Sequence, residues 1–134
     1  MMLSPGDPCP CGRADARGKP LPFVACCGVF LAGVRAAPDA ESLMRSRYTA
    51  FVLEDADYLL ATWHGSTRPP SIDFEPGLKW LGLELRDRRP IDATHAEVEF
   101  IARSRLAGRG QRLHERRRFV CEDGRWFYLD GVMR

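Results

Sequence analysis

Four cysteines in two tight pairs constrain the first part of this chain more than any other feature. Cys9 and Cys11 are separated by one proline, whereas Cys26 and Cys27 are adjacent and precede Gly28. Fourteen residues separate the two pairs. A closed tetrahedral metal site needs four donors such as thiolates, each about 2.3 Å from the ion. The surrounding segment has too few apolar residues to form a core, so we expect a metal ion to organise it.

Disulfides and unrelated buried thiols are the alternatives to a metal site. A bond between adjacent cysteines closes a small strained ring, and bonds between the two pairs suit an oxidising compartment. The N-terminus has no basic segment followed by an apolar stretch, so we expect a cytoplasmic protein without a secretory signal, in which thiols stay reduced. A four-thiolate set also suits iron, but a closed structural site needs no redox chemistry. We therefore expect structural Zn²⁺ bound by Cys9, Cys11, Cys26 and Cys27.

The rest of the chain has the composition of an ordinary folded domain. Of its 134 residues, 45% are hydrophobic and 28% are charged, and no apolar run approaches the roughly 18 residues of a membrane span. Lys19 and Lys79 are the only lysines among 20 basic residues. The densest basic run, 116–118, alternates between the faces of a predicted strand, so nucleic-acid binding is not indicated. We expect a zinc knuckle over residues 1–35 and a second domain over 36–134.

The second domain begins with helix signals and continues with strand signals. Asp39 and Glu41 place negative charge at the start of a predicted helix, and Asp55 is a candidate cap for a second, shorter helix. Alternating patterns predict strands near 80–88, 94–106, 112–121 and 125–130, with turns at 108–110 and 122–124. This order predicts an α+β domain with helices on one face of a curved antiparallel sheet. The apolar stripe of the first helix is formed by Leu43, Met44, Tyr48, Phe51 and Val52.

The cysteine segment resembles the SEC-C motif. Cys-Pro-Cys-Gly is followed by Phe-Val-Ala-Cys-Cys-Gly at residues 23–28. The motif is found at the C-terminal tail of the SecA translocation motor and on many other bacterial proteins. Members usually have Ser-Gly after Cys-x-Cys-Gly and a shorter gap, whereas this chain has Arg13-Ala14 and a longer loop. The departure leaves the four candidate ligands intact.

Longer stretches resemble the YchJ family over nearly the whole chain. The resemblance implies a SEC-C knuckle on a domain like nuclear transport factor two, in which a cone of helices packs against a curved sheet. It implies no established activity, because the function of the family is uncharacterised. The matching stretches are residues 43–51, 57–64, 80–83, 98–103, 113–116 and 123–131.

Several polar residues occupy positions where the pattern predicts an apolar residue. Arg47 lies on the helical stripe, Glu115 shares a strand face with Leu113, and Asp130 follows Tyr128 at period two. A buried arginine is costly without a partner, so the pattern predicts an ion pair between helix and sheet or a pocket for an anionic or polar ligand. The candidate pocket residues are Arg47, Tyr48, Trp63, Glu115, Trp126, Tyr128 and Asp130.

Catalysis is not indicated. No motif brings a nucleophile, a base and an oxyanion donor together, and the three histidines lie in unrelated contexts, so we predict no catalytic residue. The sequence favours a protein-interaction or adaptor module whose zinc knuckle presents a binding surface. By analogy with SecA, its partner would belong to the secretion machinery or the ribosome. The alternative is a small-ligand-binding protein or an enzyme that uses a pocket in the α+β domain.

Overall fold

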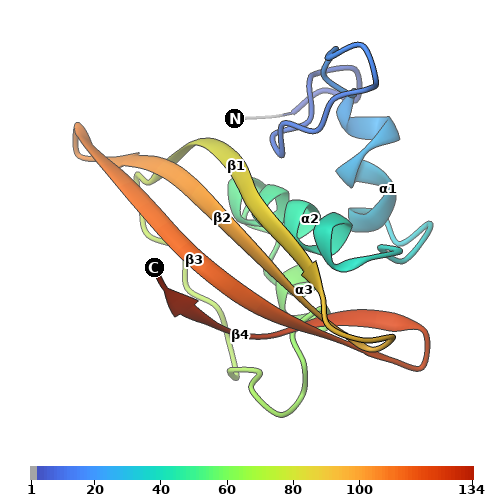
Figure 1. The fold of residues 1–134 in the computed structure, drawn as a ribbon. Helices are drawn as coiled ribbons and strands as arrows, with labels where there is room; N and C mark the ends of the chain where they lie inside the picture. The colour runs from blue at the N-terminus through green and yellow to red at the C-terminus, as the bar shows by residue number, and fades with distance from the viewer. Residues whose placement is uncertain (1–2) are drawn as a thin grey trace.

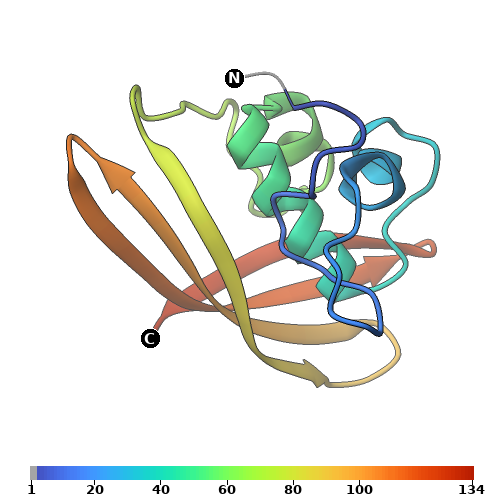
Figure 2. The same cartoon turned by 90° about the horizontal axis from the view of Figure 1, so that it is seen from above.

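Residues 3–134 are described by a computed structural model, in which a four-stranded antiparallel sheet with strand order β1-β2-β3-β4 curves around the helices (Figures 1 and 2). The predicted α+β class is confirmed. None of the helices over these residues is long and apolar enough to span a membrane. The elements are η1 (Phe23–Ala25), α1 (Cys27–Leu31), α2 (Ala40–Leu53), α3 (Ala56–Ala61), β1 (Lys79–Pro90), β2 (His95–Leu106), β3 (Arg109–Glu122) and β4 (Arg125–Met133).

Both helices of the α+β domain begin at an aspartate cap, of which the sequence predicted Asp55. The Asp39 side chain accepts a hydrogen bond from the Ser42 backbone N–H at 2.7 Å, which fixes the start of α2. The Asp55 carboxylate accepts one from the Tyr58 N–H at 3.0 Å and starts α3. An aspartate in this position satisfies an amide that the helix itself leaves without a partner. Helix α2 ends at Glu54, which adopts a left-handed conformation with φ of 57°.

Helix α2 is covered on more sides than its apolar stripe predicts. Leu43 and Tyr48 pack in the core with the sheet, as expected. Ser42 and Thr49 are buried as well, because the N-terminal segment covers another side of the helix. There, Arg13 Nη1 donates a hydrogen bond to Ser42 Oγ at 3.0 Å, and Cys9 Sγ lies 3.8 Å from Thr49 Oγ1. The helix is therefore shared between the sheet and the cysteine segment.

Two tight turns set the register of the last three strands. Asp123 and Gly124 have φ of 52° and 78°, and Ala107 and Gly108 have φ of 52° and 79°. Paired left-handed residues suit a two-residue hairpin because they match the right-handed twist of the strands. The first hairpin turns at residues 107–108, one residue before the predicted stretch 108–110. The predicted division of the chain near residue 35 stays a prediction.

Candidate metal centre

The four paired cysteines converge on one point. Their Sγ atoms all lie within 4.8 Å of one another, and the Cys11 and Cys26 sulfurs are 3.7 Å apart. A tetrahedral ion with metal–sulfur bonds of about 2.3 Å requires sulfurs about 3.8 Å apart. All five cysteines of the chain are free thiols, so the disulfide alternative is not formed. The cluster could hold one metal ion; its members, Cys9, Cys11, Cys26 and Cys27, are at most 7% exposed.

A tight turn brings the first pair together. The Gly12 N–H donates to the Cys9 carbonyl at 3.1 Å, closing a turn around Pro10. Gly12 has φ of 77°, a conformation that glycine adopts without a steric penalty. The Arg13 backbone N–H lies 3.5 Å from Cys11 Sγ and can donate to it. The sequence Cys-Pro-Cys-Gly thus supplies both ligands and the turn that aligns them.

A backbone kink brings the second pair together. Cys26 lies between η1 and α1 with φ of −123° and ψ of −116°, and Cys27 is the first residue of α1. The side chains of adjacent residues normally diverge, and this kink lets both sulfurs reach the same centre. A Cβ at Gly28 would lie 2.7 Å from the Phe23 carbonyl oxygen, closer than a carbon and an oxygen without a bond between them can approach. Only glycine therefore fits after the cysteine pair.

The thiols influence one another's ionisation. Hydrogen bonds from Cys26 and Cys27 lower the pKa of Cys11 to about 7. The interaction with Cys11 in turn raises the pKa of both Cys26 and Cys27. Thiolates this close together repel one another, and a bound cation would offset this repulsion. Metal binding should then release protons.

A charged cluster on α2 holds the first cysteine pair in place. Arg45 Nη1 donates to the Cys11 carbonyl oxygen at 2.8 Å. Glu41 accepts a hydrogen bond from Arg45 Nε at 2.8 Å, lies 3.3 Å from Arg13 Nη2 and pairs with Arg88 of β1. Burial raises the pKa of Glu41, but the hydrogen bonds from Arg45 and Arg88 outweigh it and lower the pKa overall. This glutamate therefore links the cysteine segment, α2 and β1.

We expect Glu41→Gln to destabilise the metal-loaded protein by about 1–2 kcal/mol, because the change removes the charge that three arginines share in a largely buried position. The free energy of unfolding in urea measures the effect. Glu75→Gln removes the same charge from an exposed side chain and is the matched control. Equal unfolding free energies for the two variants would show that the cluster contributes nothing.

The comparisons with known proteins cover almost the whole chain. Residues 39–131 match the family model described as YchJ, middle NTF2-like domain. The chain belongs to the YchJ family. Among the curated YchJ relatives, the "UPF0225 protein" of Polaromonas sp. is 67% identical over 136 residues, covering 98% of this chain and 97% of its own. A UPF0225 protein of Bordetella pertussis is 52% identical over 139 residues and covers 100% of both chains.

Solved structures extend the YchJ resemblance to the cysteine segment. The solution structure of a SEC-C motif containing protein from Rhodopseudomonas palustris has a TM-score of 0.82 and 34% identity, covering 96% of this chain and 99% of that one. The crystal structure of a SEC-C motif containing protein from Psychrobacter arcticus has a TM-score of 0.81 and 29% identity, covering 99% and 86%. The predicted family is thus confirmed.

Arg47, the first candidate pocket residue, is buried between aromatic rings. Its side chain is 1% exposed, and its Nη1 donates to the Leu59 carbonyl and to Thr62 Oγ1, both at 2.7 Å. Its Cζ lies 4.7 Å from the Tyr128 ring centroid and 5.1 Å from that of Trp63. Its Nε has no hydrogen-bond partner. Rings and backbone oxygen thus surround this cation.

The predicted ion pair between Arg47 and a sheet carboxylate is wrong. Glu115 accepts from Arg117 Nε at 2.9 Å, and Asp130 accepts from Arg118 Nε at 2.6 Å. A bulge explains the position of Asp130, because Arg118 pairs with Asp130 whereas the next residue pairs with Tyr128. One extra residue therefore lies between the two pairs, and Asp130 moves to the face opposite Tyr128. The period-two pattern cannot reveal such an insertion.

The other candidate pocket residues lie in aromatic contacts. Tyr48 packs edge-on against Trp80, with centroids 5.7 Å apart, and Trp63 packs against Tyr128 at 5.1 Å. Trp126 lines a cavity between the end of α1 and the start of β4. A ligand pocket formed by the seven residues stays a prediction. Sequence reasoning also missed Glu41 and Arg45, whose i,i+4 spacing was the available signal.

Each histidine is paired with a carboxylate. His64 Nε2 lies 2.7 Å from Glu122 Oε2, and His95 Nδ1 lies 3.0 Å from Asp92 Oδ1. His114 Nε2 lies 2.7 Å from Glu99 Oε2, on the opposite strand face from Leu113, as predicted. A hydroxyl also contacts two of these histidines: Ser66 Oγ lies 2.7 Å from His64 Nδ1, and Thr94 Oγ1 lies 3.0 Å from His95 Nδ1.

Proposed function

We propose that this protein binds a structural Zn²⁺ ion and that its SEC-C-like knuckle presents a surface to a protein partner in the cytoplasm. The convergence of four buried sulfurs, all within 4.8 Å of one another, supports the metal assignment. Such a set leaves no coordination position for a substrate, because structural zinc sites of four thiolates are closed. The metal would then act by shaping the segment around it.

The outer side of the knuckle is the candidate surface. Asp15 Oδ1 accepts backbone hydrogen bonds from Arg17 at 2.9 Å and from Lys19 at 3.0 Å, which orders the loop between the two cysteine pairs. Both basic residues are exposed, and Val24, five residues after Lys19, is 57% exposed. Two cations and an apolar side chain in one exposed stretch of the chain suit an acidic protein surface with an apolar patch. By analogy with the SEC-C motif of SecA, that partner would belong to the secretion machinery or the ribosome.

A pull-down with altered surface charge tests this function. The zinc-loaded wild type should capture a partner, and the purified partner should bind the wild type again. The variant Arg17→Glu/Lys19→Glu should not retain this partner. Charge reversal across such an interface costs several kcal/mol, so we expect the affinity to fall about 100-fold or more.

The matched control is Arg105→Glu/Arg109→Glu, which reverses two exposed charges near the β2–β3 hairpin. Native mass spectrometry should find one zinc ion in each variant. Equal binding by the variant and the control would contradict the proposed surface, and a chain without zinc would contradict the metal assignment.

A further inference from the structure

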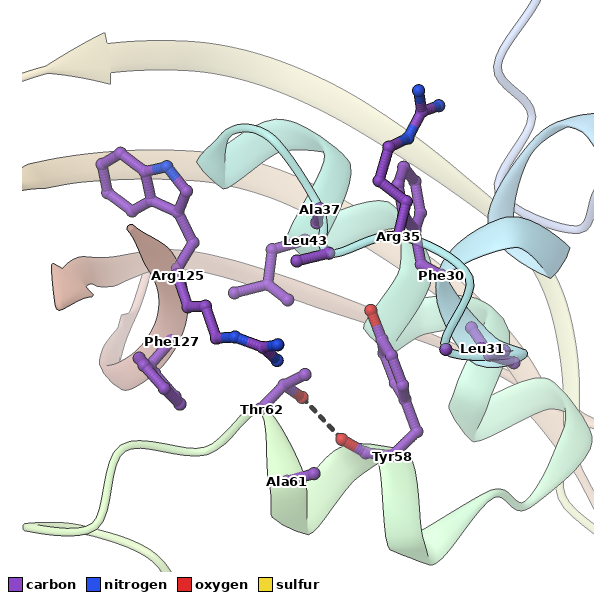
Figure 3. A pocket seen from close by; sticks show the side chains of 13 residues that line it. Phe30, Leu31, Arg35, Ala37, Leu43, Tyr58, Ala61, Thr62, Arg125 and Phe127 are labelled. Atoms are coloured by element: carbon purple, nitrogen blue, oxygen red, sulfur yellow. Dashed lines mark hydrogen bonds between the residues drawn. The ribbon is translucent and has the colours of Figure 1, made fainter. Parts of the chain in front are cut away.

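A cavity of about 240 Å³ lies where the segment after the last cysteine meets the α+β domain (Figure 3). Its walls come from the end of α1 and the following loop, from α2 and α3, and from the start of β4. Much of the lining is apolar, including Phe30, Leu31, Leu43, Trp126 and Phe127. The cavity is separate from the cysteine cluster, which lies at the other end of α1.

The charges at this cavity are all positive. Arg35 and Arg125 belong to its lining, which contains no carboxylate. Over residues 3–134, no carboxylate oxygen lies within 4.0 Å of either guanidinium. The guanidinium of Arg125 extends toward Thr62 and Tyr58 across the cavity, whereas Arg35 lies at the rim (Figure 3). A planar guanidinium without a partner is suited to bidentate binding of a carboxylate or phosphoryl group.

A third cation, Arg47, contacts a residue of the cavity lining. The Thr62 hydroxyl lines the cavity, donates to the Tyr58 carbonyl at 2.7 Å and accepts from Arg47 Nη1 at 2.7 Å. Burial and the nearby charge of Arg117 lower the pKa of Arg47 to about 9. Since Arg47 is 1% exposed and forms no ion pair, an anion in the adjoining cavity would reduce the cost of burying its charge.

We propose that this cavity binds a small organic anion, with its carboxylate or phosphoryl group against Arg125 and its apolar body against Leu43 and Trp126. A cavity of about 150 Å³ is large enough for benzene. The larger volume here therefore suits one ring, or a short branched chain, together with an anionic group. The site goes beyond the proposed partner-binding role of the knuckle and does not depend on it.

NMR titrations of the zinc-loaded full chain test the site. The probes are benzoate and phenylphosphonate, with benzamide as a neutral analogue of the same size. Saturable shifts of the Thr62 and Phe127 amides are expected with at least one anion, and the better anion identifies the preferred group. Benzamide should bind roughly tenfold more weakly, because one charge-assisted hydrogen-bonding group is lost.

Two variants locate the binding site. Arg125→Gln should weaken anion binding roughly tenfold and leave benzamide binding unchanged. Arg109→Gln makes the same change in an exposed hairpin and should have no effect. Ala61→Phe should abolish binding of all three probes by filling the cavity.

Three results would overturn the proposal. They are the absence of saturable shifts up to about 10 mM of either anion, equal affinity for benzoate and benzamide, and equal effects of Arg125→Gln and Arg109→Gln.

Discussion

The Cys27→Ser protein should bind no metal ion, and the fold of residues 23–31 should be lost while the α+β domain stays folded. The cysteine segment has little other core, because η1 buries no residue, α1 buries only Cys27, and Phe23, Phe30 and Leu31 are only partly buried. Structural zinc contributes about 10–16 kcal/mol to the folding of isolated zinc-finger peptides. Loss of this free energy should unfold a segment this small.

The α+β domain should survive because Val98, Phe100 and Phe119 of its sheet keep their core contacts with α2. The polar contacts of α2 with the cysteine segment include those of Ser42 with Arg13, Arg45 with the Cys11 carbonyl and Thr49 with Cys9. Water can replace these partners at little cost. The apolar side of α2 stays in contact with the sheet.

Native mass spectrometry and amide hydrogen exchange measure the two halves of this prediction. Cys121→Ser is the matched control, since Cys121 lies on β3 outside the cluster. We expect the control to retain one metal ion per chain and protected amides in α1. A Cys27→Ser protein that retained the metal ion in full, or the protection in α1, would show that the segment does not depend on the cluster.

The sequence predicted the features that local chemistry determines. The cysteine pairs, the negative charge at the start of α2, the cap at Asp55 and the turn at Asp123–Gly124 each depend on a few neighbouring residues, and the structure contains all of them. The strand order followed from these turns, because consecutive strands joined by short hairpins lie side by side.

The features that the sequence could not predict depend on residues far apart in the chain. A bulge in β4 placed Asp130 on the outer face with Arg118, so the partner predicted for Arg47 was wrong. The cysteine segment covers a second side of α2. The apolar periodicity of the helix does not reveal a contact with a segment elsewhere in the chain. Glu41 pairs with arginines from distant parts of the chain because α2, β1 and the cysteine segment meet at this residue.

Arg47→Ala should destabilise the protein by about 3–5 kcal/mol. The change leaves a large void in the core and removes the contacts of the guanidinium with the Tyr128 and Trp63 rings. It also removes the 2.7 Å hydrogen bond to the Leu59 carbonyl near the end of α3, where the remaining donor, Thr62 Oγ1, is 3.4 Å away. Urea unfolding followed by tryptophan fluorescence measures the loss.

Arg47→Met separates the side-chain volume from the charge. Methionine fills much of the space and carries no charge to bury, and such replacements of buried charges can be close to neutral. It still leaves the Leu59 carbonyl without its donor, so we expect a loss of about 1–2 kcal/mol, less than for Arg47→Ala. Arg112→Ala, at an exposed strand position, controls for the loss of an arginine. If both Arg47 variants unfolded at the same urea concentration as this control, the buried guanidinium would contribute nothing to stability. A larger loss for methionine than for alanine would contradict the void as the main cost of Arg47→Ala.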